Sequence, residues 1–199
     1  MRLFGEETHS TLEARLCEIV RADEMLISVL TTARDLELPD WRLVAGCLYQ
    51  TVWNQLTNRP AGHGIRDYDL VYFDGNDLSY DGEDVVIRRC AQAFGELRPP
   101  VEVRNQARVH LWFEKRFGAP YAPLASTDEG IGRYAATAHC VGIRLEPNRH
   151  LDVAAPYGLT DIFDMILRPN PTLPNAPSYG EKAARAKACW PELTIIPWD

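Results

Sequence analysis

The stretch GIRDYDLVYFD, residues 64–74, decides the fold that we predict for this chain. A glycine-containing loop leads into it, and residues 70–73 form a β-prone run. Asp67 and Asp69 stand two apart at the entry, and side chains two apart on a strand project from the same face. Two adjacent carboxylates repel unless a cation neutralises them, and Mg²⁺ is held by one or two carboxylates together with substrate phosphates. The pair indicates a metal site for phosphoryl or nucleotidyl chemistry, with an ordinary polar strand end as the alternative.

A strand, a glycine and a helix precede this stretch. Residues 41–46 predict a short strand that runs into Gly46, and residues 47–56 carry apolar side chains at helical spacing. Backbone N–H groups at the start of a helix can meet a phosphate. The junction therefore fits a phosphate site, although a plain connection between a strand and a helix has the same pattern.

A lone acidic residue follows on a later strand. Residues 84–97 predict a helix that two prolines end, and residues 101–104 predict a short strand after them. Glu102 alternates with two valines, so it projects from the face opposite to theirs. In a solvated sheet such a glutamate needs no explanation, but beside the two aspartates it would be a third carboxylate.

The rest of the pattern is mainly helical. Helices are predicted over residues 10–34, 105–117, 127–139, 158–167 and 178–189, and a hairpin over residues 141–145 and 150–154. A break rich in proline and alanine at residues 118–123 divides the chain. We expect a core with its N-terminal helix over residues 1–118 and a C-terminal α/β subdomain over residues 119–199, which covers the cleft.

Composition narrows the class of protein. The chain has 199 residues, 46% of them hydrophobic and 25% charged, as in a soluble globular protein. Its formal net charge of −7 argues against bulk binding to nucleic acid or to anionic membranes. No apolar run approaches the roughly 20 residues that span a bilayer, and the polar N-terminus does not resemble a signal peptide. The five cysteines are far apart, so we expect reduced thiols and a cytoplasmic protein.

The order of these features along the chain (strand, glycine and helix, then the two aspartates, then the lone glutamate) resembles that of the nucleotidyltransferase superfamily related to DNA polymerase β. Within it, the chain is similar to a family of bacterial nucleotidyltransferase-like proteins of uncharacterised function, over about residues 41–199. The matching stretches are AGC (45–47), QTVWN (50–54), DYDLVYFD (67–74), VRNQARVH (103–110), APYGL (155–159) and RPNP (168–171).

The resemblance implies an α+β fold with a small mixed sheet, and a role for each matching residue. Asp67, Asp69 and Glu102 would bind the catalytic Mg²⁺ or Mn²⁺, and Glu102 could also act as the base toward an attacking hydroxyl. Gly46 would allow the backbone to approach the phosphates of a nucleoside triphosphate. Cys47 stands where active members of the superfamily usually carry Ser or Gly.

The nucleotide pocket implied by the resemblance is completed by Asn105 and Gln106. The expected reaction is the transfer of a nucleoside monophosphate to an acceptor hydroxyl, and the acceptor could be a small molecule, a protein or an RNA. Two alternatives remain open. One is a nucleotide-binding or regulatory protein that retains this fold without catalytic activity, and Cys47 is the feature that favours it. A protein-interaction module could carry the carboxylates incidentally.

Overall fold

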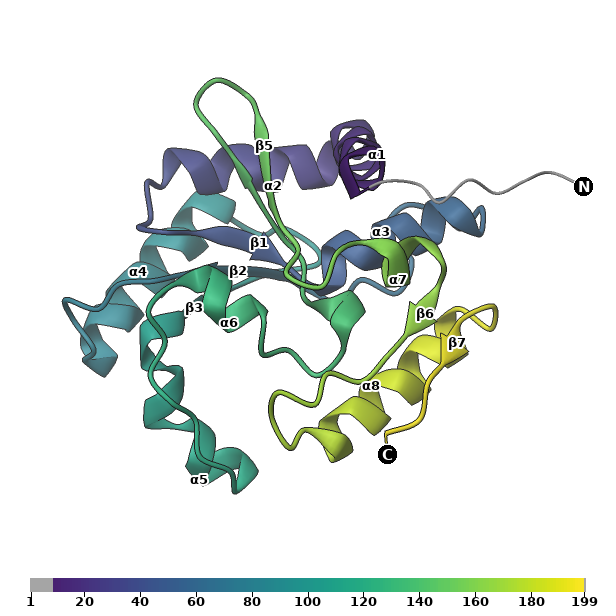
Figure 1. Cartoon of the computed structure of the whole chain (residues 1–199). Helices are drawn as coiled ribbons and strands as arrows, with labels where there is room; N and C mark the ends of the chain where they lie inside the picture. Colours follow the sequence, from purple (N-terminus) through teal and green to yellow (C-terminus); the bar gives the residue numbers. More distant parts are fainter. Residues whose placement is uncertain (1–8, 199) are drawn as a thin grey trace, which may run out of the picture.

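A mixed five-stranded sheet organises the computed structural model, which describes residues 9–198 (Figure 1). The strands are β1 Arg42–Val44, β2 Tyr68–Tyr72, β3 Val101–Asn105, β4 Gly142–Leu145, β5 Leu151–Ala154, β6 Ile166–Leu167 and β7 Thr194–Ile195. The sheet has the order β3-β2-β1-β4-β5, with β2 and β3 parallel and the other pairs antiparallel. β6 and β7 form a separate parallel pair. The predicted α+β class with a small mixed sheet is confirmed.

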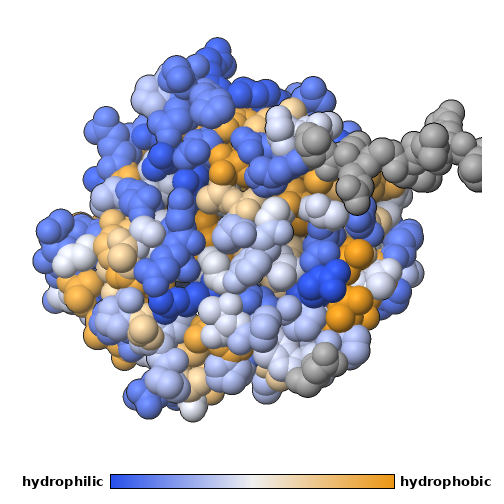
Figure 2. All heavy atoms as spheres, in the orientation of Figure 1, coloured by the Kyte–Doolittle hydropathy of each residue, from blue (hydrophilic) through white to orange (hydrophobic). Residues whose placement is uncertain are grey.

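Eight α-helices and two 3₁₀ helices complete the part of the chain that the structure describes. They are α1 His9–Ala22, α2 Glu24–Asp35, α3 Gly46–Leu56, α4 Tyr80–Phe94, η1 Gln106–Leu111, α5 Phe113–Phe117, α6 Thr127–Ile131, η2 Thr137–His139, α7 Thr160–Phe163 and α8 Ala176–Cys189. Figure 1 shows α1 and α2 on one side of the sheet and α5, α6 and α8 on the other. Figure 2 shows that the outer surface in this view is mostly hydrophilic, with small apolar patches between the polar residues.

The main core lies on the face of the sheet that α1, α2 and α3 cover. Strand residues alternate across the sheet, and Leu43, Leu70 and Ile143 are fully buried against these helices. α3 contributes Trp53, whose indole Nε1 donates to the carbonyl of Ile162 at 3.0 Å. Burial of this apolar surface is the main force that holds the helices on the sheet.

The opposite face carries a smaller apolar cluster and a buried ion pair. Val44, Val71, Ile131 and Cys140 form the apolar cluster. Arg42, only 5% exposed, lies between Asp128 of α6 and Asp152 of β5, and its Nη2 is 3.0 Å from Asp152 Oδ2. A buried guanidinium needs such partners, and these two carboxylates tie α6 and the edge strand β5 to β1.

One predicted helix is two helices in the structure. The apolar spacing over residues 10–34 predicts a continuous helix, but Asp23 adopts an extended backbone between α1 and α2. Its side chain accepts a hydrogen bond from the amide of Leu26 at 2.9 Å and caps α2. The prediction was wrong here because an N-cap residue interrupts the helix without disturbing the apolar pattern.

Three further predicted helices are shorter or irregular. Over residues 158–167, α7 covers only Thr160–Phe163, and Ile166–Leu167 form the strand β6. Over residues 105–117, the side chain of Asn105 accepts from the amide of Ala107, and the 3₁₀ helix η1 precedes the short α5. Over residues 127–139, α6 ends at Ile131, and Ala136 is extended and bridges to Pro169. In these last two cases a backbone amide bonds outside the predicted helix: that of Asn105 donates to Oε1 of Glu83, and that of Thr137 donates to the carbonyl of Arg168.

Three other expectations concern the chain as a whole. Within residues 9–198, the helices are too short or too polar to cross a membrane. All five cysteines are free thiols. The expected division after residue 118 separates β3 from β4, although β4 joins the same sheet through β1. The division into two subdomains stays a prediction.

Candidate active site

Asp69 and Glu102 lie side by side on adjacent strands. In the parallel pair of β2 and β3, Asp69 is the register partner of Glu102, and in the antiparallel pair of β1 and β2 it is the partner of Val44. Partners directly opposite in register present their side chains on the same face of a sheet. Asp67 stands directly before the first residue of β2. The carboxylates therefore gather near the ends of β2 and β3 that adjoin the start of α3.

The environment of Asp69 disfavours its charge. Burial raises the pKa of Asp69 to about 6, and the negative charges of Asp67 and Glu102 act in the same direction. Lys182 of α8 opposes these effects. A carboxylate that is largely removed from water beside other carboxylates is costly to the fold, and such groups cluster at functional sites.

The donor set has the chemistry that a hard divalent cation requires, because carboxylate oxygens are its preferred ligands. A cation would also relieve the repulsion that acts on Asp69. In the structure, however, the half-exposed side chain of Glu102 pairs with Arg104, with 3.4 Å between Oε2 and Nη2. Among residues 9–198, no three His, Cys, Asp or Glu side chains are grouped so that they could hold a metal ion. The shared metal site stays a prediction.

The N-terminus of α3 adjoins the carboxylates. Ala45 precedes it with φ 55° and ψ −114°, a region that favours glycine, and its amide donates to the carbonyl of Val141 at 2.9 Å. The amides of Leu48 and Tyr49 both donate to the carbonyl of Ala45. Within residues 9–198, no backbone carbonyl accepts a hydrogen bond from the amide of Gly46 or of Cys47. Two N–H groups are thus available to an anion, and the strained turn before them is of the kind found at ligand sites.

The side chain of Cys47 does not face this opening. It is fully buried, and Sγ lies 3.6 Å from the carbonyl oxygen of Val44. Burial raises the pKa of the thiol well above its usual value, and the charges of Asp69 and Asp67 raise it further. The thiol is therefore protonated, and Cys47 can meet a phosphate only through its backbone.

Asn105 and Gln106, the other two residues predicted to bind nucleotide, are buried. The carboxamide of Asn105 accepts from the amide of Asp74 at 3.0 Å and donates to the carbonyl of Asp74 at 2.9 Å. The side chain of Gln106 packs so closely against Gly130 of α6 that a Cβ there would lie 2.7 Å from Oε1. Both side chains thus have structural contacts, and their roles in nucleotide binding stay predictions.

Comparison with known proteins agrees with this architecture. The profile of a family described as "Nucleotidyltransferase" matches residues 31–195, most of the chain. The chain belongs to this nucleotidyltransferase family. A solved NMR structure, described as revealing a CCA-adding enzyme head domain, matches with a TM-score of 0.74 and 24% sequence identity over 93% of this chain and 96% of that one. At this identity the match shows a shared fold. No curated protein matches the chain.

This member of the family also has two buried rings, Tyr49 and His139, whose contact the sequence pattern did not reveal. The ring of Tyr49 from α3 stacks on that of His139 from η2, with centroids 4.9 Å apart and planes at 21°. Burial raises the pKa of Tyr134 well above its usual value, and the charge of Asp69 contributes to this rise. Tyr49 and His139 lie on segments 90 residues apart, so no local spacing could have paired them.

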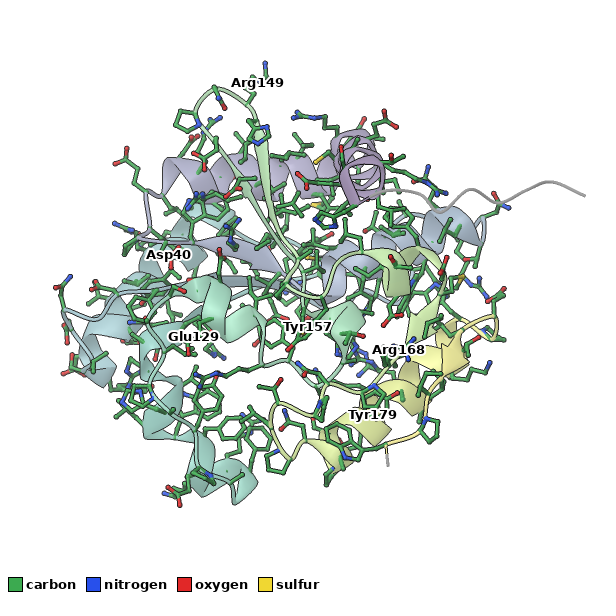
Figure 3. The ribbon with its side chains drawn as sticks, viewed as in Figure 1. Asp40, Glu129, Arg149, Tyr157, Arg168 and Tyr179 are labelled. Carbon is green, nitrogen blue, oxygen red and sulfur yellow. The ribbon has the colours of Figure 1, made fainter. Side chains whose placement is uncertain are left out.

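A buried asparagine positions the segment that carries Tyr134. Asn170, 2% exposed, donates from Nδ2 to the carbonyls of Gly132 at 2.8 Å and Tyr134 at 2.9 Å. The hydroxyl of Tyr157 donates to Gly132 O as well and contacts Asn170 Oδ1 at 3.3 Å. Figure 3 shows Tyr157 near the middle of the molecule. The motifs APYGL and RPNP of the sequence supply these two residues. Their contacts in the structure hold one wall of the site in place.

Proposed function

We propose that this protein transfers a nucleoside monophosphate from a nucleoside triphosphate to an acceptor hydroxyl and releases pyrophosphate. The observation that carries the proposal is the register of Asp69 with Glu102, next to Asp67 and to the free amides of Gly46 and Cys47. This arrangement supports the proposal, because it would bring a divalent cation and the phosphates of a nucleotide to one end of the sheet. Membership of the nucleotidyltransferase family supports the reaction type.

The residues have separate roles in the proposed reaction. The amides of Gly46 and Cys47 donate to phosphate oxygens and orient the triphosphate. The acceptor oxygen attacks the α-phosphorus, its proton passes to the carboxylate of Glu102, and the bond from the α-phosphorus to the bridging oxygen breaks, so that pyrophosphate leaves with the electron pair. A divalent cation, Mg²⁺ or Mn²⁺, held by Asp67, Asp69 and Glu102, would neutralise charge on the phosphates when bound.

One observation favours a second candidate, a nucleotide-binding protein without activity. Glu102 pairs with Arg104 in the structure, so this carboxylate already has a cationic partner. If that pair persists with a triphosphate bound, the protein would bind nucleotide and lack the base. We favour the enzyme because the pair is exposed, and exposed ion pairs contribute only about 0–1 kcal/mol.

The test is ligand binding followed by turnover. Each of the four nucleoside triphosphates is added with Mg²⁺, with Mn²⁺ or with a chelator, and the shift in Tm is recorded, because a bound ligand stabilises the fold. Pyrophosphate release is then measured with a small-molecule, a protein and an RNA acceptor. We expect cation-dependent binding in the wild type, and turnover that Glu102→Gln abolishes while binding persists.

Two results would count against the proposal. Equal triphosphate affinity in chelator and in Mg²⁺ would exclude a role of the carboxylates in holding a cation. Cation-dependent binding without pyrophosphate release from any acceptor would favour the inactive nucleotide-binding protein. A protein that binds none of the four triphosphates would fit the interaction module instead.

We place the protein in the cytoplasm. The five cysteines are unpaired, and three of them, Cys47, Cys90 and Cys140, are buried. Free thiols are typical of proteins kept in a reducing compartment. Localisation of a fluorescent fusion would test this placement.

A further inference from the structure

The motif QTVWN of helix α3 begins with a polar side chain whose contacts differ from those of its neighbours. The hydroxyl of Thr51 donates to the carbonyl of Cys47 at 2.7 Å. Asn54 donates from Nδ2 to the carbonyl of His63 at 2.9 Å, and its Oδ1 accepts from an indole N–H at 3.0 Å. These side chains are fully engaged in holding the fold, which leaves Gln50.

Gln50 has a buried acceptor without a donor. The residue is only 4% exposed, yet within residues 9–198 its carbonyl oxygen Oε1 has no hydrogen-bond partner. The other end of the carboxamide, Nε2, donates to the hydroxyl of Tyr49 at 3.3 Å. A buried acceptor that lacks a donor costs stability, and most such groups in native proteins are paired. A ligand that supplies the donor would explain why a glutamine stands here.

The carboxamide of Gln50 lies over the start of α3. A Cβ built on Gly46 would be 3.4 Å from Gln50 Nε2, so the side chain reaches back one helical turn to the residue whose amide is free. Val44, two residues before Gly46, is the register partner of Asp69. Gln50 is thus placed by contact beside an amide that the proposed function assigns to the phosphates.

The chemistry of Oε1 defines which part of a nucleotide it can meet. A carboxamide oxygen only accepts hydrogen bonds, and ionised phosphate oxygens also only accept them, so the two cannot bond to each other. The sugar is attached directly to the phosphates, and its hydroxyl groups can donate. The base lies beyond the sugar. A sugar hydroxyl is therefore the donor nearest to phosphates held at Gly46.

We propose that Gln50 accepts a hydrogen bond from a ribose hydroxyl of the nucleoside triphosphate and determines which sugar the protein selects. The inference rests on the proposed function and adds to it a specificity-determining residue. A deoxy analogue without that hydroxyl would leave Oε1 unpaired in the complex as well. Sites built to bond a hydroxyl discriminate against analogues that lack it for this reason.

The experiment compares wild type with Gln50→Met and Gln50→Leu, in which apolar side chains replace the carboxamide, by calorimetric titration with Mg²⁺. The probes are the ribonucleoside triphosphate that wild type binds most tightly, its 2′-deoxy and 3′-deoxy analogues, and inorganic tripolyphosphate. Wild type should bind one of the deoxy analogues roughly tenfold more weakly than the ribonucleotide. Both variants should bind the ribonucleotide and that analogue equally, within about twofold.

Two controls exclude an indirect effect on the fold. Tripolyphosphate carries no sugar, so both Gln50 variants should bind it as wild type does if the start of α3 is intact. Thr51→Val changes the neighbouring buried polar side chain, whose hydroxyl already has its partner, and should keep the discrimination of wild type.

The outcomes separate this inference from the proposed function. Equal affinity of wild type for all three sugars, or a preference that persists in both Gln50 variants, would overturn the inference and leave the proposed function standing. A matching loss of tripolyphosphate affinity in both variants would assign the carboxamide to the phosphates and also overturn it. A sugar preference that depends on Gln50, in a protein that releases no pyrophosphate, would support the inference and overturn the transfer reaction. A wild type that binds no triphosphate would overturn both.

Discussion

Asp69 and Glu102 are register partners on parallel strands, yet they have opposite surroundings. Asp69 is largely removed from water and has a pKa raised by burial to about 6, whereas Glu102 is half exposed and pairs with Arg104. Two neighbouring positions of the sheet thus hold one carboxylate whose charge costs stability and one whose charge is exposed to water and paired.

Asp69→Asn is expected to stabilise the protein when no divalent cation is present. The raised pKa of Asp69 means that its charged form is disfavoured in the folded state, and at pH 7 this amounts to about 1–3 kcal/mol of unfolding free energy. Chemical denaturation in chelator should show a gain of about that size. The same variant should lose the stabilisation that Mg²⁺ confers on wild type. Asp164→Asn, at an exposed aspartate, should change neither quantity, and a destabilised Asp69→Asn protein would contradict the explanation.

Gly64→Ala is expected to be strongly destabilising. Gly64 has φ +77°, and a Cβ there would collide with the ring of Trp190, lying 2.9 Å from Cζ2. Gly62 provides a matched control, since its φ is +76° but nothing lies within 4 Å of an added Cβ. We expect a loss of about 1 kcal/mol for Gly62→Ala and of about 2–4 kcal/mol for Gly64→Ala, measured by urea denaturation. Equal losses would show that backbone strain alone sets the requirement for Gly64.

Asn170→Ala is expected to loosen the wall that carries Tyr134. The variant leaves the carbonyls of Gly132 and Tyr134 without their buried donor, at a cost of about 2–4 kcal/mol. Asn148→Ala removes an exposed asparagine that accepts one hydrogen bond, from the amide of His150, and should cost less than about 1 kcal/mol. Hydrogen exchange of the amides of residues 132–140 should quicken only in Asn170→Ala. Unchanged exchange in that segment would remove the positioning role that we assign to Asn170.

His139 is expected to make the protein sensitive to acid. Burial lowers the pKa of His139 to about 3, and the charges of Lys182 and Arg185 add to this effect. The folded state therefore binds fewer protons than the unfolded state between about pH 3 and pH 6.5, so stability is full above pH 6.5 and declines as the pH falls. The His139 contribution lost between pH 7 and pH 4 should be about 3 kcal/mol.

The corresponding measurement is the unfolding free energy of wild type and His139→Phe at a series of pH values. The variant should have the shallower dependence by that amount, whatever its absolute stability, because phenylalanine retains a ring on Tyr49 and does not titrate. Identical slopes in the two proteins would mean that His139 already binds a proton in the folded state at mild acidity.

Local pattern was sufficient for much of the fold. The alternation in β2 and β3, the glycine that begins α3 and the spacing of α8 each depend on neighbours within a few residues, so the sequence alone predicts these elements and the acidic motif. The same reasoning predicts one continuous helix where the structure has α1 and α2. It misses the break because the capping hydrogen bond of Asp23 leaves the apolar spacing unchanged.

The sequence by itself determined the residue types, the strand and helix periods, and the two-residue spacing of Asp67 and Asp69. Only the tertiary structure decided that Lys182 acts on Asp69, that Tyr49 stacks on His139, and that Asn170 holds the segment around Tyr134. These contacts join segments tens of residues apart, and each depends on where the packing of helices on the sheet carries the chain. A periodic pattern specifies which face of a helix or strand is buried. Which other element covers that face depends on how all the apolar surfaces of the chain pack into one core.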